Sequence, residues 1–248
     1  MLEITNLTKT YKGTKKPAVN NISLSLKPGE IFGFLGLNGA GKSTTFKCAT
    51  GIQTFEEGTI LINGFDIEKD PLNAKQSLGY IPDNHATFEE LTGLEYINFM
   101  ADVYKVSEEL RKIRINRFAE MFNMEHALNT VIKAYSHGMK QKIAIMGGII
   151  HYPKLWILDE PLVGLDTFSM DEIMAFMKEY AKDGNTIIFS SHIMALVKEL
   201  CERVAIIDYG EIKALFEKPE DIAIIDKHFK EIVDRYGNNV NKESLQKK

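Results

Sequence analysis

The sequence of 248 residues predicts an α/β fold: a mainly parallel sheet, an antiparallel β-subdomain at the N-terminal end and an inserted α-helical subdomain. Short apolar runs of strand length recur along the chain, and helical periodicity fills the stretches between the later ones. A longer stretch in the middle has helical periodicity. Strands that alternate with helices imply right-handed crossovers in a parallel sheet. We therefore expect a core of residues 1–83 and 151–217, a helical subdomain of residues 84–150, and a C-terminal helix and tail of residues 218–248.

The N-terminal third has the patterns of β-structure. Residues Ile22–Leu26 alternate apolar and polar side chains, as a strand with one buried face does. The run Ile31–Leu35 is almost wholly apolar, which is typical of a strand buried on both faces. Between Thr59–Ile62 and Phe65–Ile67 lies an Asn-Gly pair, which accepts the positive φ angles of a type I′ turn. These segments predict two strands and a hairpin.

The middle of the chain changes to a helical spacing, with Thr92 and Ser107 as start signals. The apolar positions of the two expected helices are Leu94, Ile97, Ala101 and Tyr104, then Leu110, Ile113, Phe118, Met121 and Phe122. Buried-strand patterns return at Leu155–Leu158, Thr186–Phe189 and Val204–Ile207. The last 30 residues are amphipathic and then polar, so we expect a small accessory helix followed by a frayed tail.

Composition excludes several classes of protein. Lys and Arg number 30 against 34 Asp and Glu, a net charge of −4, so no basic field favours nucleic acid as a partner. Two cysteines, Cys48 and Cys201, allow neither a disulfide framework nor a CxxC metal site, and they suit a reducing cytosol. The N-terminus lacks the apolar core of a signal peptide, and the apolar runs are shorter than the roughly 18 residues of a membrane span.

One loop carries a phosphate-binding pattern, GxxxxGK[ST], directly after the apolar run Ile31–Leu35. Glycines let the backbone N–H groups wrap a phosphate, Lys42 reaches the β- and γ-phosphates, and the Ser43 hydroxyl can ligate Mg²⁺. The alternative is a chance glycine-rich turn, a match expected about once in 100 such chains. The strand–loop–helix context favours the core of a P-loop NTPase. The expected nucleotide contacts are Gly36, Asn38, Gly39, Ala40, Gly41, Lys42, Ser43 and Thr44.

A carboxylate pair follows the expected strand Leu155–Leu158. The strand delivers Asp159 to the carboxyl edge of the sheet, where it can hold the metal, and Glu160 is placed to orient or deprotonate a water. The alternative is a surface Asp-Glu pair that caps a strand. Hydrolysis is favoured over kinase activity, since no motif for an acceptor molecule is found.

Four further segments stand in a recognisable order: Tyr11, Tyr135–Met139 before an expected helix Lys140–Ile150, Gly164–Asp166, and His192. With them, the sequence resembles the ATP-binding subunit of ABC transporters over about residues 1–217. Taken singly, they would be an edge or core tyrosine, a helix N-cap, a loop and a structural histidine.

The resemblance implies specific roles. Tyr11 would stack on adenine, and Ser136 with the backbone near Gly138 would donate to a γ-phosphate bound by a partner subunit. The loop Gly164–Asp166 would cross between subunits, and His192 would contact the γ-phosphate. The implied catalytic residues are Glu160, His192 and Lys42; the implied Mg²⁺ ligands are Ser43, Asp83 and Asp159.

The resemblance also implies an ATPase whose two copies, identical or related, close on two ATP molecules and drive a separate membrane permease, bound peripherally at the cytoplasmic face of the cell membrane. The motif around Ser136 is similar to one branch of the family, the exporters of drugs, peptides and lipids that include bacitracin-resistance-like systems. Cargo recognition would belong to the permease, so the sequence does not reveal the cargo.

Four positions depart from the family pattern. Asp83 stands where Gln is common; it can hold Mg²⁺ or water but cannot donate an amide hydrogen bond. His137 and Met139 replace Gly and Gln, and Val163 replaces a frequent Ser. Lys42, together with the acidic pair and His192, is intact, so we expect activity to be kept, with its rate and coupling open to change.

A segment near the start of the expected helical subdomain is rich in aromatic residues. This aromatic-rich segment predicts either a surface for a partner's coupling helix or a local helical core: His85, Ala86, Phe88, Leu91 and Tyr96.

Three rival functions remain: an ATPase of nucleic-acid repair or translation, a GTPase, and a non-catalytic binding protein. The first usually has a long insertion or second cassette, and the second needs an Asn-Lys-x-Asp motif, which Asn241–Ser244 does not supply.

Overall fold

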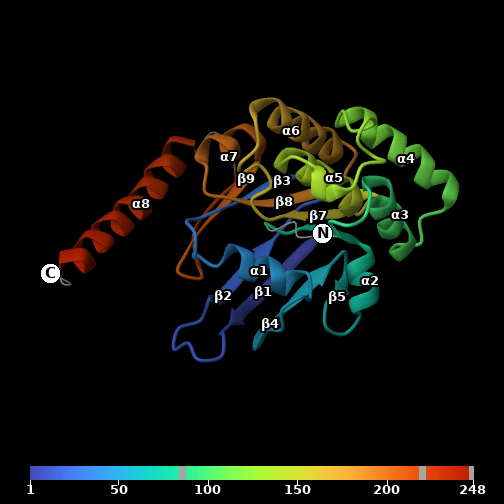
Figure 1. Cartoon of the computed structure of the whole chain (residues 1–248). Helices are drawn as coiled ribbons and strands as arrows, with labels where there is room; N and C mark the ends of the chain where they lie inside the picture. The colour runs from blue at the N-terminus through green and yellow to red at the C-terminus, as the bar shows by residue number, and fades with distance from the viewer. Residues whose placement is uncertain (84–87, 218–221, 246–248) are drawn as a thin grey trace.

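Two sheets form the frame of the computed structural model, which describes residues 1–83, 88–217 and 222–245 (Figure 1). The smaller sheet is antiparallel, as expected for the N-terminal part. In spatial order its strands are β2 (Val19–Ser25), β1 (Leu2–Lys9), β4 (Glu57–Ile62) and β5 (Phe65–Asp66). Asn63 and Gly64 join β4 to β5 with φ angles of 51° and 86°, which confirms the predicted turn.

The larger sheet has six strands, five of them parallel. Their spatial order is β10 (Glu211–Phe216), β9 (Arg203–Asp208), β3 (Ile31–Leu35), β8 (Thr186–Ser191), β7 (Leu155–Leu158) and β6 (Leu78–Ile81), with β10 antiparallel to β9. Because β3, β7 and β8 are parallel neighbours, the loops that follow them emerge at one edge. Glu160 and His192 lie in two of those loops, and Lys42 begins the helix that follows the third.

Strands β3 and β7 lack polar side chains because both of their faces are covered. Along β3, Ile31 and Leu35 join the core beneath α3–α7, whereas Phe32 and Phe34 join a second core with the antiparallel sheet. The same alternation continues in β7, where Trp156 packs in the first core. This two-sided burial explains why these strands lack the alternation seen in β2.

Helices cover the sheets as Figure 1 shows, with α4, α5 and α6 grouped on the side away from the antiparallel sheet. The bounds are α1 (Lys42–Ala49), α2 (Pro71–Gln76), α3 (Gly93–Val103), α4 (Glu108–Met121), α5 (His137–Ile149), α6 (Thr167–Lys182) and α7 (Met194–Leu200), with a 3₁₀ turn at Ile132–Ala134. Thr92 and Ser107 cap α3 and α4 as predicted, and Thr92 forms a capping box with Glu95.

The C-terminal helix differs from the prediction. In place of a small helix and a frayed tail, α8 runs from Ile222 to Leu245 and projects from the body of the molecule (Figure 1). Ile225, Phe229 and Ile232 bury an apolar seam against the core, and Lys198 Nζ lies 2.6 Å from Asp226 Oδ2. No proline interrupts the polar residues that suggested a tail, so their sequence permits a continuous helix.

Within the described residues, no helix is long and apolar enough to span a membrane.

Candidate active site

The phosphate-binding loop joins β3 to α1 through residues that tolerate unusual backbone geometry. Gly39 and Gly41 have φ angles of 83° and 112°. A Cβ atom on Gly41 would lie 2.6 Å from the carbonyl oxygen of Ala18, and one on Gly36 would lie 2.6 Å from that of Ile207. Both the conformation and the close packing therefore require glycine at Gly41.

The loop opens onto a cavity of about 360 Å³. Its lining consists of Ala18, Asn38, Gly39, Gly41, Lys42, Ser43, Thr44, Asp83 and Glu160. Gly36 and Ala40, two predicted nucleotide contacts outside this lining, support the loop through their backbones. Gly36 N donates to Ser191 O at 3.1 Å, and Ala40 O accepts from Gly210 N at 2.8 Å. The β9–β10 turn thus helps to fix the loop.

The predicted catalytic residues lie in one connected row. The buried Lys42 Nζ lies 3.1 Å from Glu160 Oε1 and donates to the carbonyl oxygens of Gly36 and Leu37 at 2.8 and 3.3 Å. The other Glu160 oxygen, Oε2, lies 3.0 Å from His192 Nδ1. The fold therefore brings the predicted lysine, base and switch histidine together from the ends of three strands.

Asp159 lies behind this row and is fully buried. Burial raises the pKa of its carboxyl group, while the hydrogen bond from Ser190 and the nearby Ser43 hydroxyl oppose that rise. Ser190 Oγ donates to Oδ1 at 2.6 Å, and the buried Oδ2 lacks a hydrogen-bond partner among the described residues. A buried carboxylate oxygen without a partner is an unsatisfied acceptor that a cation would complete.

The oxygen atoms at and behind the cavity wall fit Mg²⁺. Ser43 and Asp83 line the cavity with a hydroxyl and a carboxylate, and the buried Asp159 carboxylate lies next to Ser43. Within the described part of the chain, no three His, Cys, Asp or Glu side chains group closely enough to hold a metal alone. A site with few protein ligands suits Mg²⁺, which takes one or two carboxylates together with substrate phosphates and water.

Tyr11 stands at the mouth of the cavity. Its side chain is 37% exposed, so it is not the core tyrosine that its sequence position also allowed. Its hydroxyl lies 3.3 Å from Thr44 Oγ1, at the start of α1, and Lys9 Nζ lies 5.8 Å from the ring centroid. The ring is therefore tied to the phosphate-binding loop while part of its surface stays accessible for stacking.

The predicted γ-phosphate donors lie elsewhere. Ser136 caps α5, which begins three residues earlier than predicted, and its hydroxyl accepts from Met139 N at 3.2 Å. The described lining of the cavity includes neither Ser136 nor Gly138. His137 Nε2 lies 3.4 Å from Val163 O, so two of the four departures from the family pattern contact each other. Within a single chain, the Ser136 motif therefore lies apart from Lys42 and the cavity.

The aromatic segment divides between surface and core. Phe88 is 50% exposed and its ring centroid lies 5.1 Å from that of Phe99 on α3. Tyr96 is only 4% exposed and Leu91 is partly buried, so the alternative of a local helical core is confirmed for Tyr96. Tyr96 packs against Gly147 of α5, where a Cβ would approach its ring to 2.5 Å. His85 and Ala86 lie outside the described residues.

Two contributors to the site were not predicted from the sequence. Ala18 lines the cavity from the segment that precedes β2. Ser190 binds Asp159 and also accepts from Glu160 N at 2.9 Å. The Ser-Ser-His context of His192 was a signal, but assigning Ser190 needed the β7–β8 pairing.

A glycine-rich phosphate loop, an acidic pair after β7 and a histidine after β8 meet at one sheet edge. This arrangement defines a P-loop nucleoside triphosphatase. A family model described as ABC transporter matches residues 19–163, and the chain belongs to this family.

Named relatives agree with this assignment. The linearmycin resistance ATP-binding protein LnrL of Bacillus subtilis (strain 168) is 38% identical over 220 residues, which cover 89% of this chain and 70% of that protein. The solved ATP-binding subunit of an ABC transporter is 32% identical, with a TM-score of 0.82 over 87% of this chain and 89% of that one. The cassette MJ0796, solved as a dimer bound to ADP and Pi, is 25% identical, with a TM-score of 0.79 over 87% and 98%. The chain is an ATP-binding, ATP-hydrolysing cassette of an ABC transporter.

Proposed function

We propose that this chain works as half of an ATP-driven dimer that powers export through a separate membrane permease. The observation that carries the proposal is the separation of the site into two parts. Lys42 and Glu160 line the phosphate cavity and His192 contacts Glu160, whereas Ser136 lies exposed at the start of α5, outside the described lining. A second copy is a natural source for the missing half, and the dimeric MJ0796 cassette supports this arrangement.

Hydrolysis would begin with a change of partners at Lys42. In the structure, its Nζ lies 3.1 Å from the Glu160 carboxylate. The phosphates of ATP are stronger competitors for that ammonium group, so binding would release Glu160. Glu160 would then accept a proton from the attacking water, while Lys42 and His192 stabilise charge on the transferred phosphoryl group.

Ser43, Asp83 and Asp159 would hold Mg²⁺. When bound, the ion would neutralise negative charge on the phosphates. Asp83 lines the cavity and is exposed, so its carboxylate can reach the ion directly or through water in place of the family's glutamine.

Closure of the dimer would place each ATP between one chain's phosphate loop and the other chain's Ser136 and Gly138. The N-terminus of α5 carries partial positive charge, which favours a phosphate there. The loop Gly164–Asp166 would lie across the interface. Hydrolysis removes the γ-phosphate that joins both surfaces, so the pair would reopen.

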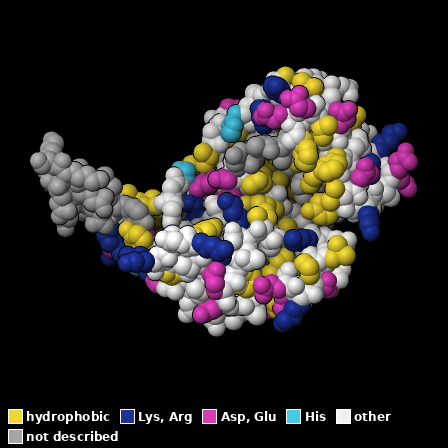
Figure 2. Space-filling model, turned by 60° about the horizontal axis from the view of Figure 1, so that its bottom comes forward, with side chains coloured by type: hydrophobic (Ala, Val, Ile, Leu, Met, Phe, Trp, Pro, Cys, Tyr) yellow, Lys and Arg dark blue, Asp and Glu magenta, His cyan; other side chains and the backbone are white. Residues whose placement is uncertain are grey.

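The helical part of the chain, residues 84–150, would act as a subdomain that transmits this motion. Figure 2 shows hydrophobic side chains gathered beside a hollow on the side of the molecule where α2 and α3 lie. The exposed Phe88 and Phe99 offer an aromatic contact for a permease segment. A relative named for linearmycin resistance favours export of a drug-like or lipid cargo, and the chain would sit at the cytoplasmic face of the membrane.

The composite site can be tested with aspartate at two helix N-caps. Aspartate is itself a good N-cap, so Ser136→Asp and Ser107→Asp should both preserve their helices. Only the first places a carboxylate where a γ-phosphate would bind. We expect Ser136→Asp to lower turnover at least about tenfold while monomer affinity for ATP stays unchanged, with Ser107→Asp equal to wild type. Unchanged turnover in Ser136→Asp would refute the composite site, and weakened monomer binding would place Ser136 within its own chain's site.

A further inference from the structure

A serine at the end of β8 links the two acidic residues of the site. Ser190 is fully buried. Its hydroxyl donates to Asp159 Oδ1 at 2.6 Å and accepts from the backbone N–H of Glu160 at 2.9 Å. This one hydroxyl therefore acts as a donor to Asp159 and as an acceptor for Glu160, the two residues that directly follow β7.

The backbone that this hydroxyl contacts has an unusual conformation. Asp159 N still follows the sheet and donates to Ile81 O at 2.9 Å. The next residue, Glu160, has a φ angle of 50°, in the left-handed region that non-glycine residues rarely occupy. Such a conformation persists only where surrounding contacts hold it. The contact to Ser190 is made by the N–H group of this residue.

The turn decides where the Glu160 side chain goes. From the left-handed position, its two carboxylate oxygens reach Lys42 at 3.1 Å and His192 at 3.0 Å. A residue that continued the strand geometry would send its side chain in another direction, because successive strand residues alternate between faces. The orientation of the carboxylate thus depends on the backbone conformation that the serine contacts.

We propose that Ser190 is a positioning residue for ATP hydrolysis. Its hydroxyl holds Glu160 in the left-handed turn that aims the carboxylate at the reaction site. The inference rests on the proposed role of Glu160 as the general base.

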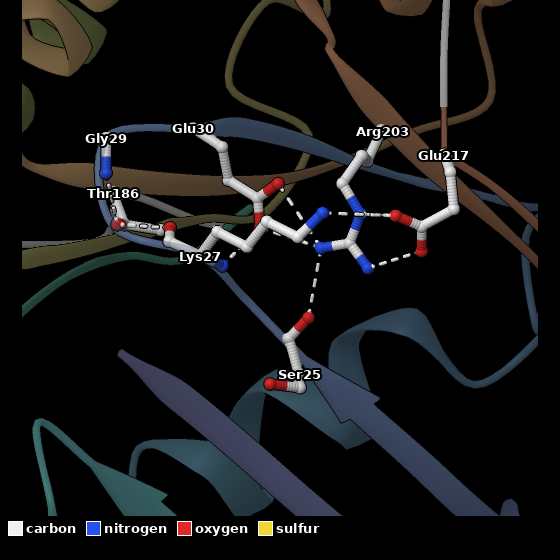
Figure 3. Close-up of polar contacts among 7 residues, drawn as sticks. All are labelled: Ser25, Lys27, Gly29, Glu30, Thr186, Arg203 and Glu217. Carbon is white, nitrogen blue, oxygen red and sulfur yellow. Dashed lines mark hydrogen bonds and ion pairs between the residues drawn. The ribbon is translucent and has the colours of Figure 1, made fainter.

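The same strand supplies a matched control. Thr186, at the opposite end of β8, is also fully buried. Its Oγ1 donates to Lys27 O at 2.9 Å and accepts from Gly29 N at 3.1 Å. Figure 3 shows it beside the network of Glu30 and Arg203, in which Arg203 Nη1 lies 2.9 Å from Glu30 Oε1. Thr186 therefore bridges two backbone groups as a structural hydroxyl at the far end of the strand.

The experiment compares Ser190→Ala with Thr186→Val in the full chain. Both remove a buried bridging hydroxyl, so both should lower the unfolding midpoint similarly. We expect Ser190→Ala to lower kcat about 10- to 100-fold, as misplaced catalytic groups do, with KM and the affinity for ATP within twofold of wild type. Thr186→Val should keep its kcat. Equal kcat values in the two variants, or a loss of ATP affinity parallel to that of kcat in Ser190→Ala, would overturn the proposal.

A double variant separates this inference from the proposed role of Glu160. If Ser190 acts through Glu160, then adding Ser190→Ala to Glu160→Gln should lower kcat by less than threefold, because the effects are not additive. A further 10-fold loss would overturn the positioning role. Wild-type turnover of Glu160→Gln alone would instead refute the base assignment. A severely slowed Glu160→Gln with a fully active Ser190→Ala would refute only the inference about Ser190.

Discussion

His151 makes the stability of this fold dependent on pH in a predictable direction. Its imidazole stacks on Tyr104, which caps the C-terminus of α3, with ring centroids 3.5 Å apart, and its Nε2 lies 3.0 Å from Leu78 O on β6. Burial lowers the pKa of His151 from 6.5 to about 4. The neutral ring therefore joins the helical part of the chain to the edge strand of the larger sheet.

The sign of the effect follows from proton binding. Between pH 6.5 and about 4, the unfolded chain protonates this histidine while the folded chain does not. The unfolded state then binds more protons, so the free energy of unfolding falls as the pH falls through this window. At pH 5, the loss relative to pH 7.5 is about 2 kcal/mol, approaching about 3 kcal/mol near pH 4.

The substitution His151→Gln isolates this contribution. Glutamine retains an N–H donor for Leu78 O but does not titrate. Urea unfolding at pH 7.5 and pH 5 should show that wild type loses about 2 kcal/mol more than the variant over this interval. Parallel losses in the two proteins would refute the assignment of a neutral, buried His151.

Two further substitutions address the nucleotide and the partner. Lys42→Ala removes the ammonium group next to Gly36 O and Glu160. It should weaken ATP binding at least about tenfold in calorimetric titration, whereas Lys69→Ala, on an exposed side chain, should not. Wild-type affinity in Lys42→Ala would contradict the role of the loop. Phe88→Ser should abolish co-purification of the chain with its permease from membranes while basal ATPase activity persists. Leu215→Ser, at the opposite sheet edge, serves as the control, and retained co-purification by Phe88→Ser would argue against that contact surface.

The sequence predicted those parts of the molecule that depend on local patterns. The run Ile31–Leu35 was recognised as a strand because both of its faces are buried, and the two cores on either side of β3 explain why. The phosphate loop was predictable since glycines and Lys42 have fixed spacing along one loop. Asp159 and Glu160 were predictable because they follow a buried strand directly.

The rest depends on contacts between distant segments. Tyr96 has the same local pattern as an exposed aromatic residue, and only its packing against Gly147 makes it part of the core. The role of Ser190 depends on the pairing of β7 with β8. The support that Gly210 gives to Ala40 required the β9–β10 hairpin, which the sequence patterns had not indicated.

The length of α8 was missed for a different reason. Helical periodicity is visible where a helix buries an apolar face, as at Ile225 and Phe229. The later part of the helix, from residue 237 on, is mostly polar in sequence. Its polar residues therefore resembled a tail.

The central claim is that Glu160 hydrolyses ATP held between two copies of the chain. Light scattering of Glu160→Gln with and without ATP tests it most directly. Glutamine keeps the shape of the side chain but cannot accept the proton, so the ATP-bound pair should persist. The account predicts a monomer of 28.1 kDa without nucleotide, a species of twice that mass with ATP, and little turnover. A chain that remains monomeric with ATP, or that hydrolyses ATP at the wild-type rate, would contradict it.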